Sequence, residues 1–331
     1  MTRKLRAAVI GVGYLGRFHA QKYAALAAST ESQVTLIGVA DAQHDTARRV
    51  AQELGVPAFG DHHALFGQVD LVSIASTTES HYAVARDFLA AGVHVLVEKP
   101  ITVTVAEADE LIALAAAKNL VLQVGHLERF NPVWLAARPQ IARPLFIEAH
   151  RMAPFKPRGT DVSVVLDLMI HDLDLILPLL DSPLVDLRAA GVSVLTDGID
   201  IANARLEFAN GCVANLTASR TSTASLRRLR VFQHHDYLSI DFGERRIGHA
   251  AKKVGAGATA NTTADTDPAT LLDSESRQLP PGDALLTEIE AFLAAVKNGT
   301  PPVVSGRDGR AALAVALDIE QMITSRQNSL S

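Results

Sequence analysis

The first 125 residues alternate between short apolar runs and stretches of alanine-rich, helical composition. Leu5–Ile10 is an apolar run that ends in glycines, Tyr14–Ala28 is helical in composition, and Val34–Ala40 is a second apolar run. The alternation continues with strands expected over residues 71–75, 93–97 and 120–124 and helices over 46–54, 62–66, 80–91 and 104–118. Apolar strands separated by crossover helices are typical of a parallel, doubly wound α/β sheet. We therefore expect the N-terminal part of the chain to form such a sheet.

After Gly125 the pattern changes to strand-like segments joined by turns, among them the hairpin signal Asn210-Gly211. One apolar helix is expected over Val162–Leu177, and the sequence between residues 250 and 278 predicts a long loop. The expected strands cover residues 187–195, 201–208, 212–219, 229–234 and 237–241, and amphipathic helices over 283–297 and 307–325 close the chain. This pattern predicts a mostly antiparallel α+β domain, and we place the domain boundary between residues 124 and 125. The closing helices can alternatively pack back on the N-terminal domain.

Composition limits the class of protein. A length of 331 residues suggests two domains. The chain has 31 Lys and Arg against 36 Asp and Glu, a net charge of −5, which argues against binding to nucleic acid or to an anionic membrane. A single cysteine, Cys212, excludes an internal disulfide framework, and no apolar run approaches the ~20 residues of a membrane span. We expect a cytoplasmic protein with neither nucleic acid nor a membrane as partner.

A glycine-rich loop lies between the first expected strand and the first expected helix. Its glycines are Gly11, Gly13 and Gly16, with Tyr14 and Leu15 between the last two. Such glycines permit a tight turn, close approach of the backbone to a pyrophosphate, and placement of the phosphates at the helix N-terminus. The loop predicts dinucleotide binding, and the alternative is a turn that serves packing alone.

Asp41 follows the second expected strand. A carboxylate at that position accepts hydrogen bonds from ribose hydroxyls and repels a 2′-phosphate, so NAD is favoured over NADP. Two alternatives stay open. Asp41 can be a simple cap of the helix that follows, and Arg48 and Arg49 could still permit some NADP binding.

The tripeptide Glu98-Lys99-Pro100 closes a strand at the carboxyl edge of the expected sheet, where such folds bind ligands. A lysine there can hydrogen-bond a substrate hydroxyl and stabilise its developing negative charge. The alternative is a solvated lysine at the end of a strand.

The expected helix over residues 162–177 is apolar nearly all round, yet it carries ionisable residues. At 100° per residue, Asp167, His171 and Asp174 fall within about 60° of one face, whereas Asp172 points elsewhere. Asp167, one turn before His171, can orient the imidazole and raise its proton affinity, which predicts a general base. The alternative is an Asp–His network that braces two domains.

Two metal-based chemistries compete with this interpretation. His171-Asp172 resembles the His-Asp pair of metal-dependent phosphohydrolases, but those folds are helical throughout. A metal site that uses His126 or His150 would need a ligand pair at a zinc-like spacing, and the sequence offers none. We therefore expect no metal.

Taken together, these motifs resemble the Gfo/Idh/MocA oxidoreductases, a family that includes glucose–fructose oxidoreductase and inositol dehydrogenase. The resemblance rests on the loop Gly11–Gly16, Asp41, the segment Ser76–His81, Glu98-Lys99-Pro100 and Asp167-x-x-x-His171-Asp172, and it covers essentially the whole chain. It implies a Rossmann domain with a doubly wound parallel sheet that binds NAD over residues 1–124. It also implies a C-terminal α+β domain with a large, mostly antiparallel open sheet over residues 125–331, which forms a homodimer or homotetramer.

The resemblance further implies hydride transfer between a sugar or cyclitol carbon and a nicotinamide. Lys99 matches the family lysine that contacts both substrate and cofactor, and Asp167 and His171 match its Asp/His pair, with His171 taking the hydroxyl proton. Further cofactor contacts are expected from Ser76, Thr77, His81 and Glu98. Thr77-Thr78 departs from the proline that the family often has there, and His81 can alternatively be an ordinary first-turn helix residue.

Two segments before the apolar helix, 125–132 and 151–158, resemble the branch of the family that oxidises UDP-N-acetylglucosamine at its 3-hydroxyl for surface glycans of the lipid A type. Cations in these segments could neutralise a diphosphate, or they could lie on the surface or bridge protomers: Arg129, Arg151, Lys156 and Arg158. The predicted substrate-binding residues are His126, Arg129, Asn131, Arg151, Arg158 and Asp172. Alternative functions are oxidation or reduction of a free cyclitol or aldose, and a non-catalytic dinucleotide-binding sensor.

Overall fold

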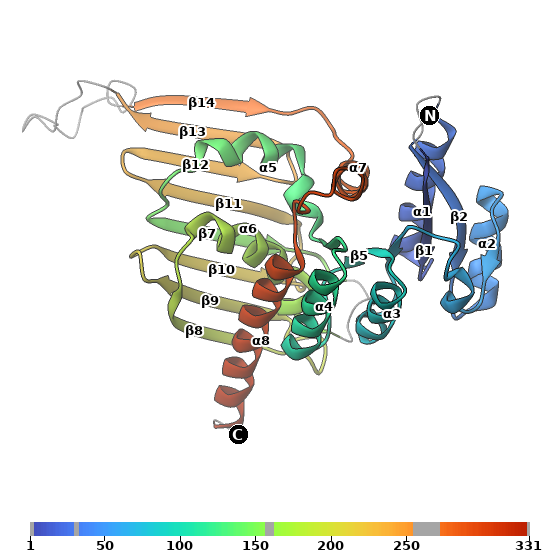
Figure 1. Ribbon diagram of the computed structural model, residues 1–331. Helices are drawn as coiled ribbons and strands as arrows, with labels where there is room; N and C mark the ends of the chain where they lie inside the picture. Colours follow the sequence, from blue (N-terminus) through green and yellow to red (C-terminus); the bar gives the residue numbers. More distant parts are fainter. Residues whose placement is uncertain (1–2, 30–32, 156–161, 254–271, 330–331) are drawn as a thin grey trace, which may run out of the picture. The chain divides into compact units, whose positions relative to one another are not determined.

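A computed structural model describes the chain except for residues 1–2, 30–32, 156–161, 254–271 and 330–331 (Figure 1). The chain forms two compact units. The first consists of Met1–Phe130 with Asp283–Ala314, and the second of Asn131–Gly282 with Val315–Ser331.

The first unit is built on a six-stranded parallel sheet with the strand order β3-β2-β1-β4-β5-β6. Its strands are β1 (Leu5–Ile10), β2 (Val34–Ala40), β3 (Ala58–Phe59), β4 (Leu71–Ile74), β5 (His94–Glu98) and β6 (Leu122–Gly125). The order reverses at β1, which pairs with β2 on one side and β4 on the other. Ligands bind at such a switch point, beyond the carboxyl ends of the strands. The predicted doubly wound parallel sheet is confirmed.

Helices connect these strands as expected from the sequence. They are α1 (Tyr14–Ala28), α2 (His44–Leu54), the short 3₁₀ helix η1 (His62–Leu65), α3 (Thr78–Ala90) and α4 (Val105–Ala117). Helix α4 begins with a capping box, because Thr104 and Glu107 each bond to the other's backbone N–H.

The helix α7 (Ala284–Asn298) belongs to the core of the first unit. Its residues Ile289 and Phe292 share one buried cluster with Val9 of β1 and Val39 of β2. The sequence-based division at residue 124 left open that the closing helices pack back on the N-terminal domain, and the apolar side chains of α7 do pack with the N-terminal strands. The long helix α8 (Gly306–Asn328) begins in the first unit and ends in the second.

The second unit contains an eight-stranded sheet in its described part, with the strand order β14-β13-β12-β11-β7-β10-β9-β8 (Figure 1). The strands are β7 (Phe146–Met152), β8 (Leu184–Val192), β9 (Ile201–Phe208), β10 (Val213–Ser219), β11 (Leu226–Gln233), β12 (Asp236–Asp241), β13 (Arg246–Lys252) and β14 (Leu272–Gln278). Strands β7 and β10 are parallel, and the other neighbouring strands of this sheet are antiparallel. The predicted large, mostly antiparallel sheet is confirmed.

Helical segments cover one face of this sheet. They are α5 (Pro132–Ala137), η3 (Arg138–Gln140), the π-helical segment η4 (Val165–Met169) and α6 (Ile170–Leu180). Helix α5 contacts β12 and β13, and η4 contacts β10. Along β9, Ala202, Ala204 and Leu206 are fully buried while Asn203 and Arg205 between them are exposed. This alternation is typical of a strand with one covered face.

The prediction of a long loop over residues 250–278 is wrong at both ends of that range. Strand β13 extends to Lys252, and β14 occupies Leu272–Gln278; residues 254–271 lie outside the described part of the chain. All seven residues of β14 are exposed, so the strand has no apolar alternation by which its sequence could indicate it. No helix in the described residues is long and apolar enough to span a bilayer.

Candidate active site

A cavity of about 550 Å³ opens at the carboxyl ends of β1, β2 and β4 in the first unit. The glycine loop, Asp41 and the turn after β4 line it, together with residues that the sequence analysis did not single out. Its size lies in the range of small-molecule and cofactor sites. The lining residues include Gly11, Gly13, Asp41, Gln43, Thr46, Asp61, His62, Ser76, Thr77 and Ser80.

Two glycines of the loop are required by close backbone contacts. Gly11 has a φ of +78°, and a Cβ there would lie 2.5 Å from the backbone of Ser76. A Cβ on Gly16 would lie 1.8 Å from the carbonyl oxygen of Gly11. Gly13 differs, because a Cβ there would meet nothing within 4 Å. Gly13 is the N-cap of α1, so the helix N-terminus faces open space that a phosphate can enter.

Both carboxylate oxygens of Asp41 accept backbone hydrogen bonds. The Val12 N–H donates to Oδ2 at 2.9 Å, and the Gln43 N–H donates to Oδ1 at 2.8 Å. Asp41 therefore joins the glycine loop to the turn before α2, but it is not the cap of that helix, because the N-cap of α2 is Gln43. An ionised carboxylate has about four acceptor positions, so each oxygen can still accept a bond from a ribose hydroxyl.

The turn after β4 is organised by Ser80 and His81. Ser80 Oγ donates to Ser76 Oγ at 2.7 Å, and Thr77 is the N-cap of α3. His81 is buried, with Nδ1 at 2.8 Å from the Pro100 carbonyl oxygen and Nε2 at 3.2 Å from that of Ser76. Burial lowers the pKa of His81, against the effect of these two hydrogen bonds. His81 thus joins this turn to the Lys99 turn, and its predicted contact with the cofactor stays a prediction.

Lys99 follows β5 directly, and its peptide bond to Pro100 is cis. Its N–H donates to Glu98 Oε2 at 3.3 Å, and Glu98 Oε1 lies 2.9 Å from Nε2 of the buried His19. The backbone of the predicted catalytic lysine is therefore bound to a buried pair of ionisable residues.

These residues fit a dinucleotide. Gly13 offers space at a helix N-terminus, Asp41 offers carboxylate acceptors, and Ser76 and Thr77 bring hydroxyls to the same cavity. The first turn of α1 contains no acidic residue that would repel a phosphate. Leu15 and Tyr14 occupy this first turn, with Tyr14 65% exposed.

Asp167 and His171 lie in the second unit, where the helix differs from the expected one. Residues Val165–Met169 form a π-helix, and the α-helix begins at Ile170 and continues past Pro178 to Leu180. Hydrogen bonds in a π-helix span five residues, so the α-helical spacing used to place Asp167 and His171 on one face does not apply here. Both side chains are half-buried. π-segments are frequent at functional sites, which agrees with the predicted role.

Asp172 and Arg151, both predicted to bind substrate, form a buried ion pair with each other. Arg151 Nε donates to Asp172 Oδ2 at 3.1 Å and Nη2 donates to Oδ1 at 2.7 Å, a two-pronged geometry that fixes both side chains. Arg151 comes from β7 and Asp172 from α6. The pair attaches the helix of His171 to the sheet, and direct substrate contacts of either residue stay predictions.

Arg129 and Asn131, also predicted to bind substrate, have local partners as well. Arg129 lies 3.6 Å from Asp308, His126 is 1% exposed, and Asn131 caps α5 by accepting the Val133 N–H at 3.1 Å. Lys156 and Arg158 lie outside the described residues. Arg129 and Arg151 both face carboxylates, and their predicted contacts with a diphosphate stay predictions.

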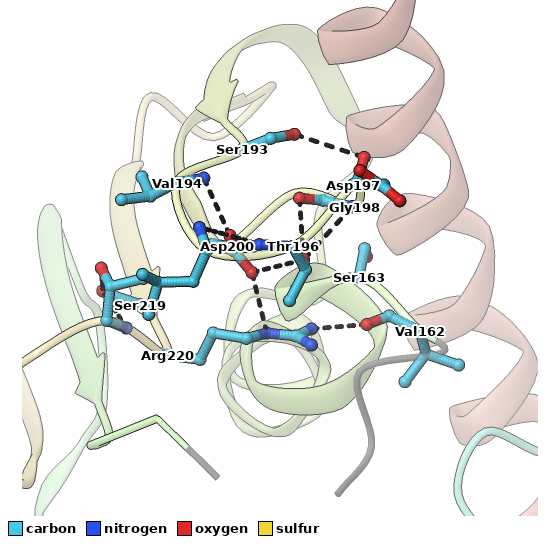
Figure 2. A network of polar contacts seen from close by, with 12 residues as sticks. Val162, Ser163, Ser193, Val194, Thr196, Asp197, Gly198, Asp200, Ser219 and Arg220 are labelled. Atoms are coloured by element: carbon cyan, nitrogen blue, oxygen red, sulfur yellow. Dashed lines mark hydrogen bonds and ion pairs between the residues drawn. The ribbon is translucent and has the colours of Figure 1, made fainter. Parts of the chain in front are cut away.

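A second polar network of the second unit surrounds Asp200 (Figure 2). Oδ2 of Asp200 accepts three backbone N–H groups, from Val194, Leu195 and Thr196, and Oδ1 accepts the Thr196 hydroxyl. Burial alone would raise the pKa of Asp200, but these hydrogen bonds lower it to about 2. Arg220 lies 3.8 Å from Asp200 and donates to the Val162 carbonyl oxygen, just before η4 (Figure 2).

Two clusters in the described residues each present three side chains of the kinds that bind metals. One is Asp61, His62 and His63 at the surface, and the other is His19, Glu98 and Glu288, all buried. Neither contains His126 or His150, the residues of the metal site weighed from the sequence.

Sequence reasoning missed His19, Ser80 and Asp200. A signal for His19 was available, because the buried residues of α1 are Gly16, His19, Ala20 and Tyr23, at the spacing of one helical face. An ionisable residue on the buried face of the first helix predicts a buried partner. That the partner is Glu98 could not be inferred, since 79 positions separate the two residues.

Comparisons with known proteins agree with this architecture. Residues 5–126 match the family model of the oxidoreductase family with an NAD-binding Rossmann fold, and residues 137–236 match that of the GFO/IDH/MocA C-terminal domain. UDP-N-acetylglucosamine 3-dehydrogenase of Acidithiobacillus ferrooxidans is 43% identical over 316 residues, which are 95% of this chain and 96% of that protein. A solved structure of that enzyme is 41% identical, with a TM-score of 0.87 over 98% of this chain and 99% of the other. Myo-inositol 2-dehydrogenase of Thermotoga maritima is 27% identical over 93% of both chains.

The sheet order, the glycine loop and the acid that follows β2 define a dinucleotide-binding fold, and the family match makes the protein an oxidoreductase with NAD as its cofactor. The chain belongs to the Gfo/Idh/MocA oxidoreductase family. The resemblance inferred from the motifs is thereby confirmed.

Proposed function

We propose that this protein oxidises a secondary hydroxyl of a nucleotide sugar with NAD, and that its substrate is UDP-N-acetylglucosamine, oxidised at the 3-hydroxyl. The observation that carries the proposal is the 43% identity, over 95% of the chain, to a protein named for that reaction. The likeness extends through both units, since the matching solved structure covers 98% of the chain. The product, a 3-keto sugar, would be a precursor of a 3-amino sugar for surface glycans.

Three residues share the chemistry in this proposal. His171 takes the proton of the hydroxyl, Lys99 polarises the oxygen on which charge develops, and Asp167 orients the imidazole of His171. One C–H bond and one O–H bond of the substrate break while its C=O bond forms, so a hydride and a proton leave the sugar. When bound, NAD supplies the acceptor for the hydride.

The first unit supplies the groups that would hold NAD. The N-terminus of α1 behind Gly13 binds the pyrophosphate, and Asp41 accepts bonds from the ribose. The hydroxyls of Ser76 and Thr77 face the same cavity. A carboxylate at Asp41 disfavours the 2′-phosphate of NADP.

We also propose that the protein works in the cytoplasm as a homodimer or homotetramer formed through the sheet of the second unit. Its single cysteine suits a reducing compartment. Strand β8 ends the sheet and exposes Val185 and Val192, at 63% and 56%. An edge strand with exposed apolar side chains favours pairing with another chain.

The deciding experiment follows the absorbance of the reduced nicotinamide after UDP-N-acetylglucosamine is added to protein and NAD. Hydrazine in the assay traps the ketone, so an unfavourable equilibrium cannot hide turnover. Myo-inositol and glucose are tested in parallel, because the 27% identity to a myo-inositol 2-dehydrogenase favours a free cyclitol as the second candidate. A rise with the UDP-sugar alone supports the proposed substrate. A rise only with a free polyol, or no rise at all, contradicts it.

A further inference from the structure

A histidine and a glutamate are buried against each other next to the turn that carries Lys99. His19 lies on the buried face of α1 with no exposed surface, and Glu98 is the last residue of β5 and 7% exposed. Nε2 of His19 lies 2.9 Å from Oε1 of Glu98. Ionisable groups are strongly disfavoured in a protein interior unless they are paired, so this pair needs a structural or functional reason.

The second carboxylate oxygen of Glu98 faces the backbone of Lys99. The Lys99 N–H donates to Oε2 at 3.3 Å. Gly125, opposite Glu98 in the ladder between β5 and β6, leaves room for the carboxylate, because a Cβ there would lie 2.8–2.9 Å from its carbon and oxygens. Glu98 therefore connects His19 on α1 with the amide of Lys99.

The other side of the same turn is held from α3. His81, 1% exposed, lies 2.8 Å from the carbonyl oxygen of Pro100, the residue after Lys99. Helices α1 and α3 both begin at the cofactor cavity, since their N-caps, Gly13 and Thr77, line it. The backbone of Lys99 is thus attached on both sides to helices that start where the cofactor binds.

We propose that His19 is a positioning residue, which acts through Glu98 to hold Lys99 in place relative to the bound cofactor and substrate. The inference rests on the proposed function, because that function assigns Lys99 the role of polarising the substrate oxygen. A lysine ammonium sits on a flexible four-carbon stem, so its reach is defined only when its backbone is fixed. A displacement of about 1 Å in such a group lowers a rate by about 100-fold.

The substitution His19→Leu tests this role, since it removes the imidazole and keeps an apolar side chain in the core. We expect kcat with the sugar to fall about 10- to 100-fold, whereas KM for NAD changes less than about threefold. Hydrogen–deuterium exchange of the Lys99 amide should become about tenfold faster or more, because its acceptor is no longer held. Pro100 has no amide hydrogen, which simplifies resolution of the Lys99 signal by fragmentation.

A rescue variant and a matched control separate positioning from a general loosening of α1. His19→Gln keeps a donor toward Glu98 and should recover most of kcat and of the Lys99 amide protection. Tyr23→Phe removes a buried hydroxyl one turn further along the same helix face, where it bonds Ser73 at 3.0 Å. This control should leave kcat and Lys99 exchange unchanged.

Gly125→Ala disturbs the same carboxylate from the other side and gives a second test if His19→Leu does not fold. Unchanged Lys99 exchange in a folded His19→Leu or Gly125→Ala protein overturns the positioning role. If the unmodified protein does not oxidise the sugar but Lys99 exchange rises as expected, the proposed function fails and the positioning role stands.

Discussion

The backbone of Lys99 is held in the turn that follows β5. The Lys99 N–H donates a hydrogen bond to the Glu98 carboxylate, and the carbonyl oxygen of the following residue, Pro100, contacts His81. Lys99→Ala leaves these backbone bonds possible, so the cavity for NAD should persist. We expect turnover to fall by about 100-fold or more, the effect of losing one group that stabilises an oxyanion.

The measurements for Lys99→Ala are initial rates with the sugar and NADH binding by fluorescence. NADH affinity should stay within about threefold of the unmodified value, because Lys99 does not supply the glycine-loop contacts. Lys4→Ala, which changes an exposed lysine just before β1, is the matched control. Full turnover in Lys99→Ala would remove the lysine from the mechanism.

Asp41 should decide between the two dinucleotides. Asp41→Ala removes a carboxylate that repels a 2′-phosphate, so we expect the ratio of kcat/KM for NAD to that for NADP to fall about tenfold or more, equivalent to roughly 1.4 kcal/mol. Asp45→Ala removes a fully exposed acid on α2 and should leave the ratio as it was. An unaltered ratio in Asp41→Ala would contradict its ribose role.

For single residues, the sequence predicted which side chains are polar and lie at a site better than it predicted which residues those side chains contact. The glycine loop and Asp41 were found because each follows an apolar run that predicts a strand, and parallel pairing of β1 and β2 brings the ends of the two strands together. Arg151 and Asp172 were each assigned to substrate, yet they bind each other. Such pairing depends on how β7 and α6 meet, which one sequence does not reveal.

Among the elements of the second unit, the loop before β9 depends on one carboxylate. The Asp200 carboxylate accepts hydrogen bonds from the backbone N–H groups of three successive residues (Figure 2). Arg220 lies 3.8 Å from this carboxylate and donates a hydrogen bond to the Val162 carbonyl oxygen, just before the π-segment. In Asp200→Asn, an amide replaces a charged acceptor amid these donors. We expect the free energy of unfolding to fall by about 2–4 kcal/mol.

Urea titration followed by tryptophan fluorescence measures the free energy of unfolding of the second unit. The single tryptophan, Trp134, is buried in the second unit. Asp197→Asn changes an exposed acid of the same loop and should alter stability little. Equal stability of the two variants would show that the Asp200 bonds do not hold the loop.

The Asp200 carboxylate should also make the stability of the fold depend on pH in the acidic range. The pKa of Asp200 is lowered to about 2 in the folded chain, so the unfolded chain binds the proton more readily. Its stabilisation, on the order of 2 kcal/mol, is therefore present above the unfolded pKa of about 4 and is lost as the pH falls toward 2. Stability measured between these pH values should fall less steeply in Asp200→Asn than in Asp197→Asn, and equal slopes would contradict the assignment.

Elements with a clear period were predicted well, and those without one were not. Strands β1 and β2 and helix α1 agree with their predicted bounds, because their apolar runs and glycine stops are local signals. The π-segment before α6 could not be foreseen, since its residues have ordinary helical composition. Strand β7 was missed because Arg151 interrupts its buried apolar positions.

For the whole molecule, we expect sedimentation to show a dimer or tetramer. Val192→Lys places a charge on the exposed edge strand β8 and should shift the distribution toward smaller species. Val103→Lys changes an exposed valine of the first unit and should not. A monomer in the unmodified protein would contradict assembly, and an unchanged distribution in Val192→Lys would place the contact elsewhere.

The first unit is discontinuous in the chain, and this affects its synthesis. Met1–Phe130 emerges from the ribosome long before α7, whose Ile289 and Phe292 complete the buried cluster around β1 and β2. Until then, that part of the core has no cover, and exposed apolar surface of this kind promotes aggregation. The nascent N-terminal sheet therefore stays partly uncovered until a helix that follows the whole sheet of the second unit in the sequence has been made.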